Sequence, residues 1–108
     1  MAFTVMQGSE QGSLRLNGEL DVAEADEFIE RATSDLSPDA DLVLELDGLT
    51  FIDSSGVRAL VTVAGRLHGG HRLVLRDPTP AVRRVLDLVG ITEAATTIVI
   101  DPSNADRP

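Results

Sequence analysis

The residues of this 108-residue chain best suited to chemistry are the consecutive Asp53-Ser54-Ser55-Gly56, with Arg58 about one helical turn further on. They lie between an apolar, strand-like segment and a segment with helical spacing, which places them where a helix begins. Asp and Ser side chains there accept hydrogen bonds from free N–H groups of the first turn, so capping is one interpretation. A serine at a helix start is also suited to carry a phosphate, because the free amides and the helix dipole favour an anion. The pattern leaves both interpretations open.

Two other chemistries are compatible with the residue types but not with their spacing. A nucleophile elbow needs Gly-x-Ser-x-Gly, whereas this chain has Ile-Asp-Ser-Ser-Gly. His68 and His71 flank a Gly-Gly stop at the far end of the same expected helix, roughly 20 Å from Ser54 at ~1.5 Å per residue. The histidines also lack an acidic third ligand beside them. We therefore expect no catalytic serine, no metal site and no cofactor.

Composition excludes further classes of protein. The chain has no cysteine, which excludes disulfides, thiolate metal sites and cysteine nucleophiles. All nine cations are arginine, and the absence of lysine excludes the phosphate-loop lysine and Schiff-base enzymes. The net charge of −9 argues against binding to DNA or anionic membranes. The first 54 residues hold 13 acids and two arginines, which fits either a solvated acidic helix or an acidic surface for a basic partner.

Hydrophobic periodicity and turn residues predict the elements that position this site. Gly18 is expected to break the second strand, and Asp21 with Glu24 resembles a capping box that opens the first helix. Thr79 is the expected cap of the third helix, which Gly90 ends. The expected strands are 2–6, 13–17, 41–46, 72–76 and 96–100, and the expected helices are 22–36, 55–67 and 80–89.

The order β-β-α-β-α-β-α-β predicts an α/β domain, a small mixed sheet of about five strands with packed helices. The first two strands are expected to form a hairpin or an antiparallel edge pair, and the alternation from residue 41 onward predicts parallel right-handed crossovers. We expect one domain over residues 1–101 and a loose tail over 102–108. The chain shows no charged leader and no apolar run of roughly 18 residues, which makes the cytoplasm the expected location.

Three blocks of the sequence resemble the STAS domain of the anti-sigma factor antagonist type. They are Gly18-Glu19-Leu20-Asp21, the run LVLELDGLTFIDSSGVRAL at 42–60, and the run DPTPAVRRVLDLVGI at 77–91. With their spacing they cover nearly the whole chain, residues 3–100. The Asp-Ser-Ser-Gly element is specific in this setting and would be weak alone.

The resemblance implies a binding module without catalytic activity. In this family the serine directly after the Asp, here Ser54, is phosphorylated by a kinase that is also the anti-sigma factor. The unmodified protein binds the anti-sigma factor and frees the sigma factor, and a separate serine phosphatase resets the phosphorylated form. The resemblance further implies that the partner is contacted by residues around this serine, in a protein that is a monomer or weak dimer. These partner-binding residues are Asp21, Asp53, Ser55, Gly56 and Arg58.

One departure from the family pattern is Arg58, which follows Val57 where the family often has Gly. Its long cationic side chain could hold a phosphate or select a particular partner. The resemblance also implies an alternative function, a non-phosphorylated STAS subunit of a lipid-transport ABC system or a stress-signalling complex.

Overall fold

The computed structural model describes residues 3–34 and 40–101. Within these ranges the chain folds in the expected order, with a short additional helix before the last strand. The strands are β1 (Phe3–Gln7), β2 (Ser13–Leu20), β3 (Leu42–Ile52), β4 (Leu73–Arg76) and β5 (Ile98–Asp101). The helices are α1 (Ala25–Ser34), α2 (Ser54–Gly65), α3 (Pro80–Val89) and α4 (Ile91–Ala94).

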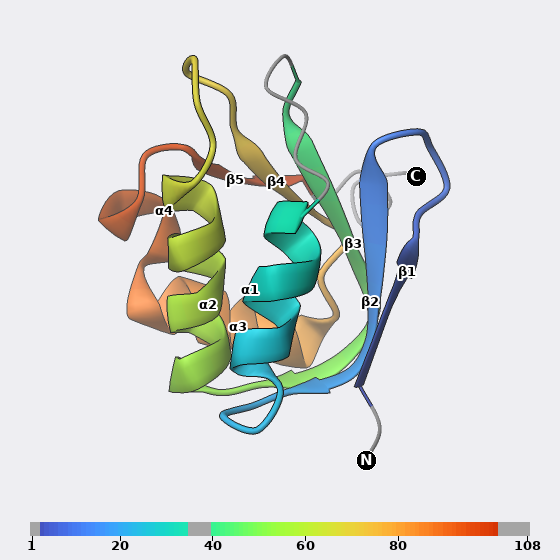
Figure 1. Ribbon diagram of the computed structural model, residues 1–108. Helices are drawn as coiled ribbons and strands as arrows, with labels where there is room; N and C mark the ends of the chain where they lie inside the picture. Colours follow the sequence, from blue (N-terminus) through green and yellow to red (C-terminus); the bar gives the residue numbers. More distant parts are fainter. Residues whose placement is uncertain (1–2, 35–39, 102–108) are drawn as a thin grey trace, which may run out of the picture.

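The strands form one mixed sheet in the order β1-β2-β3-β4-β5 (Figure 1). β1 pairs antiparallel with β2, and every other neighbouring pair is parallel. The predicted α/β class, the antiparallel first pair and the parallel remainder are all confirmed. The carboxyl ends of neighbouring parallel strands share one edge of a sheet, and those of β2 and β3 lie at the lower edge in Figure 1.

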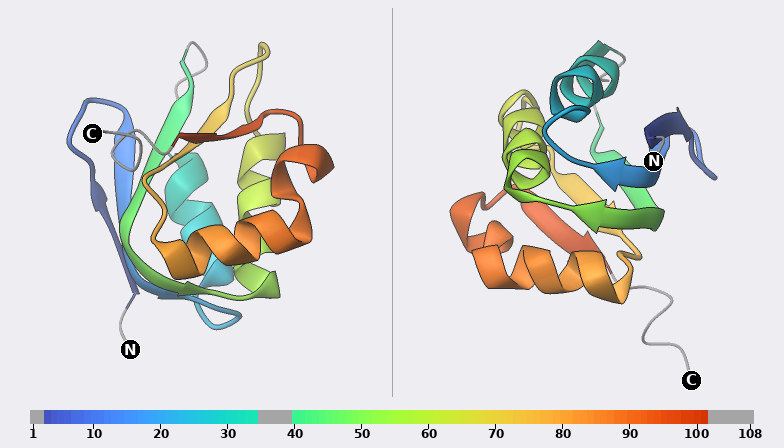
Figure 2. Two further views of the ribbon diagram at one scale, coloured as in Figure 1. Left: turned by 180° about the vertical axis from the view of Figure 1, so that it is seen from behind. Right: turned by 90° about the horizontal axis from the view of Figure 1, so that it is seen from below.

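The helices lie on the sheet as amphipathic elements. α1 and α2 run side by side, as both Figure 1 and the view from below in Figure 2 show. α3 packs against β3, and its cap Thr79 donates a hydrogen bond from Oγ1 to the Leu49 carbonyl at 3.0 Å. The predicted caps of α3 are confirmed, because Thr79 Oγ1 accepts from the Val82 amide and Gly90 is left-handed with φ of 64°. None of the helices among residues 3–34 and 40–101 is both long and apolar enough to cross a membrane.

One face of the sheet carries an aliphatic core. Leu44, Leu73 and Leu75 have no exposed surface, and they pack with buried residues of the helices in a single cluster. Phe28 of α1 is the only fully buried aromatic residue in the described ranges, and its ring meets Phe3 edge-on at 6.2 Å. Burial of these side chains supplies most of the free energy that holds the helices on the sheet.

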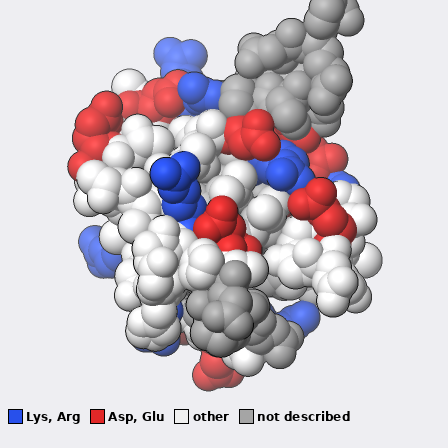
Figure 3. All heavy atoms as spheres, turned by 90° about the horizontal axis from the view of Figure 1, so that it is seen from above, with Lys and Arg blue, Asp and Glu red and all other residues white. Residues whose placement is uncertain are grey.

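The opposite face carries a row of alternating charges. Arg15, Glu45, Arg76 and Asp101 are register partners across β2 to β5. Arg15 pairs with Glu45 at 2.8 Å and Arg76 with Asp101 at 3.2 Å. Arg76 also pairs at 3.1 Å with Glu10, from the β1–β2 turn. Figure 3 views the end of the molecule where the parallel strands begin, and there arginine and acidic side chains lie next to one another.

Two predicted strand boundaries are wrong because glycines sit inside strands rather than ending them. β2 continues through Gly18, whose φ of 97° coincides with a shift in its register on β3. β3 continues through Asp47 and Gly48, and a Cβ at Gly48 would lie 2.0 Å from Asn17 Oδ1. Such β-bulges place an extra residue in one strand without interrupting the sheet.

The predicted start of the first helix is also wrong. Asp21 does not cap α1; its Oδ1 accepts from the Ala23 amide at 3.0 Å, in a separate turn. α1 starts at Ala25, after that turn, with Asp26 and Glu27 in its first turn. The predicted end of this helix at Leu36, with its Ser37-Pro38 stop, falls outside the described residues, as do Ala2 of the first strand and the tail 102–108.

Candidate functional site

The site begins where two parallel strands end together. Leu20 of β2 and Ile52 of β3 are register partners, so Asp21 and Asp53 follow at the same edge of the sheet. The Asp53 amide donates to the Leu20 carbonyl at 3.3 Å, which ties the two chain segments together. The structure therefore brings together two acids that are 32 positions apart in the sequence.

Asp53 is the N-cap of α2. Its backbone is extended, with φ of −113° and ψ of −172°, and its Oδ1 accepts from the amides of Ser55 at 2.9 Å and Gly56 at 3.1 Å. One carboxylate oxygen thus satisfies two of the orphan N–H groups at the helix start. The capping interpretation is confirmed for Asp53, and α2 begins at Ser54, one residue earlier than predicted.

The side-chain hydroxyls of Ser54 and Ser55 take no part in this cap. Ser54 is exposed and Ser55 is half-buried. Within the described residues neither hydroxyl makes a hydrogen bond, because the carboxylate of Asp53 does the capping. A solvent-facing, unengaged hydroxyl is therefore available for modification at Ser54.

Gly56 has a packing role that its sequence position does not reveal. It is buried, and a Cβ built there would lie 2.6 Å from the Leu20 carbonyl oxygen and 2.6 Å from Ile52 Cγ1. A glycine is required because only a residue without a side chain lets the first turn of α2 approach the end of β2. Its contact with a partner stays a prediction.

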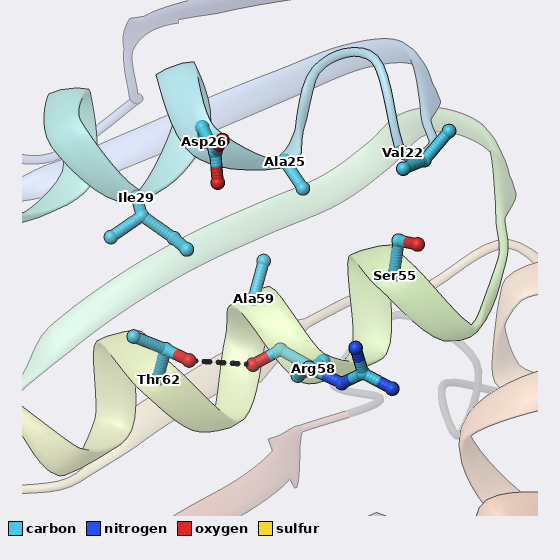
Figure 4. A pocket seen from close by; sticks show the side chains of 8 residues that line it. All are labelled: Val22, Ala25, Asp26, Ile29, Ser55, Arg58, Ala59 and Thr62. Atoms are coloured by element: carbon cyan, nitrogen blue, oxygen red, sulfur yellow. Dashed lines mark hydrogen bonds between the residues drawn. The ribbon is translucent and has the colours of Figure 1, made fainter.

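Arg58 lies in a groove of about 320 Å³ between α1 and α2. Figure 4 shows the groove from close by: Asp26 and Ile29 project from α1, and Ser55 and Arg58 from α2. The exposed guanidinium extends toward the N-terminal end of α2. The backbone carbonyl of Arg58 accepts from Thr62 Oγ1 at 3.0 Å, an ordinary bond within the helix.

The family model described as STAS domain matches residues 5–102 of the chain. This protein belongs to the STAS domain family.

Solved structures share the fold of this chain. An anti-sigma factor antagonist from Mycobacterium paratuberculosis has a TM-score of 0.76 at 24% identity, over 97% of this chain and 90% of that one. The antagonist SpoIIAA in its unphosphorylated form has a TM-score of 0.67 at 21% identity, over 96% and 91%. An anti-sigma-factor antagonist (STAS) domain protein from Planctomyces limnophilus has a TM-score of 0.65 at 17% identity, over 95% and 92%. At these identities the likeness shows a shared fold.

The α1 wall of the groove in this STAS domain was not among the predicted site residues. Asp26 is its one charged member and half-buried Ile29 supplies apolar surface, to which exposed Val22 adds from the turn before α1. The helical spacing of Ala25 and Ile29 was the available signal, because positions four apart share one helix face. That this face meets α2 beside Arg58 depends on tertiary packing.

The two histidines of the STAS domain lie far from the serines. Both are in the turn region after α2, whose 12 residues span roughly 18 Å at ~1.5 Å per residue. His71 Nδ1 lies 3.4 Å from Asp41 Oδ1, at the opposite end of the molecule from Ser54. Neither imidazole is placed to act as a base for a serine.

Proposed function

We propose that this STAS domain is an anti-sigma factor antagonist controlled by phosphorylation of Ser54. In its unphosphorylated form it binds an anti-sigma factor with serine kinase activity, and the sigma factor is released. Phosphorylation of Ser54 ends this binding, and a serine phosphatase restores it. The protein acts in the cytoplasm as a substrate and binding partner, without catalytic activity of its own.

The observation that carries the proposal is the free hydroxyl of Ser54. It is exposed in the first turn of α2, while Asp53 alone accepts from the Ser55 and Gly56 amides. A purely structural cap would not need two further hydroxyls beside it. The similar structures add support, since they are of anti-sigma factor antagonists and one is specified by its phosphorylation state.

The chemical step is a phosphoryl transfer from ATP. Ser54 Oγ forms a bond to the γ-phosphorus, the bond from that phosphorus to the β–γ bridging oxygen breaks, and ADP leaves. The hydroxyl proton passes to a base on the kinase. The phosphatase then hydrolyses the ester with water, which returns the serine hydroxyl and releases inorganic phosphate.

The added phosphate acts on the interface rather than on the fold. It brings about −1.5 to −2 charge to an exposed position, where the start of a helix tolerates an anion. In a packed interface the dianion must lose its hydration or meet a partner's carboxylate, which costs free energy. A penalty of roughly 3 kcal/mol lowers affinity about a hundredfold, since each 1.4 kcal/mol is tenfold.

Contacts to the anti-sigma factor are expected from the residues around Ser54. Asp21 and Asp53 lie at the same sheet edge, and Arg58 and Ser55 line the neighbouring groove. The exposed apolar side chains of Val22 and Phe51, 73% and 46% accessible, flank this edge and would be buried by a partner.

The test uses each purified anti-sigma factor kinase from the same organism with ATP. Mass spectrometry locates the phosphate, and affinity is measured before and after the reaction. We expect phosphate on Ser54, a loss of affinity on the order of a hundredfold, permanent binding by S54A, and weakened binding by S54E. S55A is the matched control and should still accept phosphate.

Phosphate on Ser55, or unchanged affinity with Ser54 fully phosphorylated, would overturn the proposed mechanism. A protein that binds no anti-sigma factor and carries no phosphate in its native cells would instead fit the alternative role, a non-phosphorylated STAS subunit of another assembly.

A further inference from the structure

Arg58 is a cation without an acidic partner beside a phosphorylatable serine. Among residues 3–34 and 40–101, Arg15, Arg76 and Arg83 form ion pairs with carboxylates, whereas Arg58 forms none, like Arg31, Arg66, Arg72 and Arg84. Arg58 is the one basic residue that lines the α1–α2 groove. Its exposed side chain is therefore free to pair with an anion that arrives later.

The spacing of Ser54 and Arg58 suits such a pair. They are four positions apart on α2, and residues at i and i+4 are neighbours on a helix surface. An anion placed N-terminal to its cation is the better orientation for a pair of this kind. Figure 4 shows the guanidinium already extending toward the end of α2 at which Ser54 lies.

Two acids at this end of the groove do not offer a phosphate a positive partner. Asp53 precedes it in the chain, and its carboxylate holds the amides of Ser55 and Gly56. Asp26, on the α1 wall, is negative as well. The guanidinium of Arg58 can offset a dianion at position 54 in addition to the helix dipole, and its planar donors match phosphate oxygens.

We propose that Arg58 forms an intramolecular ion pair with the phosphate of phosphorylated Ser54. This inference rests on the proposed function, because the pair exists only when Ser54 carries phosphate. The state of Ser54 then also sets the state of Arg58: the guanidinium faces the groove and solvent in the unmodified protein and is engaged at position 54 in the phosphorylated one. A partner that contacts Arg58 loses that contact at the same time as it meets the phosphate.

The test places phosphoserine at position 54 by genetic encoding, so that no kinase is needed. The second pKa of the phosphate is followed by ³¹P NMR in otherwise native protein, in R58Q and in R66Q. R66Q is the matched control, because Arg66 is an exposed arginine directly after the far end of the same helix. A neighbouring cation stabilises the dianion, so we expect a pKa lower by about 0.3 unit or more with Arg58 present than in R58Q.

Three further results distinguish a pair from a general change in structure. R66Q should leave the phosphate pKa unchanged, R58K should retain most of the shift, and the difference should shrink in high salt because the pair is exposed. Circular dichroism of R58Q checks that α2 is intact. Equal phosphate pKa values with Arg58 and in R58Q would overturn the inference. Because the phosphoserine is encoded, that result would not bear on the kinase reaction or on the binding switch, which are tested separately.

Discussion

At the scale of single residues, Asp53 performs two tasks that can be separated. Its carboxylate caps α2 through the amides of Ser55 and Gly56. In the proposed function it also stands next to the phosphorylated serine and contacts the partner. An Asn keeps a capping oxygen and removes the charge, so the two tasks respond differently to substitution.

We predict that D53N changes the free energy of unfolding by only a few tenths of a kcal/mol, whereas D53A lowers it by about 1 kcal/mol. Denaturant unfolding of the three proteins measures this. Slower phosphorylation of D53N at unchanged stability would show that the charge serves the kinase. Equal phosphorylation rates for D53N and the native protein would show that Asp53 only caps α2.

Two glycines of α2 provide a matched pair. A methyl group at Gly56 would meet the Leu20 carbonyl and Ile52, whereas nothing lies within 4 Å of a Cβ at Gly65. We predict that G56A lowers the free energy of unfolding by about 1–3 kcal/mol through overpacking. G65A should raise it by about 0.5–1 kcal/mol, because alanine is the better helix former. Similar effects of both substitutions on the denaturation midpoint would contradict the close approach of α2 to β2.

At the scale of elements, α2 is held by its inward stripe. Leu60 has no exposed surface and belongs to the single core cluster. We predict that L60A lowers the free energy of unfolding by about 2–5 kcal/mol, because it leaves a cavity. L88A on α3 is the control: Leu88 is 78% exposed, and its truncation should change stability by no more than about 0.5 kcal/mol. Equal unfolding midpoints for the two variants would mean that α2 faces the other way.

The β1–β2 hairpin is joined to β3 through the buried carboxylate of Glu45. Burial raises its pKa, but hydrogen bonds from the Ser9 hydroxyl and amide and the Ser13 hydroxyl, with the Arg15 charge, outweigh this and hold the pKa below its ordinary value. A depressed pKa in the folded state stabilises the protein above the ordinary value of 4.5. This contribution is lost as the pH falls through the folded-state pKa.

We therefore predict that native protein loses more stability between pH 6 and pH 3 (about these values) than E45Q does, since the variant cannot take up the proton. Urea unfolding at the two pH values measures the difference. E30Q, at an exposed position of α1 without an ion pair in the described residues, should behave like the native protein. An E45Q curve parallel to the native one would remove Glu45 as the source of the pH dependence.

At the scale of the whole molecule, charge governs which partners can approach. The chain carries a net charge of −9, and its acids are concentrated in the first half. We predict no binding to a short labelled DNA duplex at physiological ionic strength (about 0.15 M), because the phosphate backbone is repelled. Fluorescence anisotropy measures this. Association with an anti-sigma factor should weaken as salt is added if the acidic half meets a basic surface, and an affinity independent of salt would assign those acids to solvation alone.

Local pattern was enough to determine the α/β class, the order of the main elements, and the caps at Thr79 and Gly90. A cap is made by bonds within three or four positions of the helix end, so its residues carry the signal themselves. The Asp53–Gly56 segment could be placed at a helix start for the same reason. The sequence did not show which of its side chains caps the helix and which is free.

Tertiary structure alone decided what depends on a partner strand or helix. The predicted strands end before Gly18 and Gly48, yet both glycines lie inside strands, because β3 accommodates an extra residue at each of two bulges against β2. Asp21 joins Asp53 because β2 and β3 end at one edge, and Gly56 is required because α2 sits on that edge. The groove beside Arg58 exists because α1 packs on α2. No window of a few residues contains that information, because each contact joins segments that are distant in the chain.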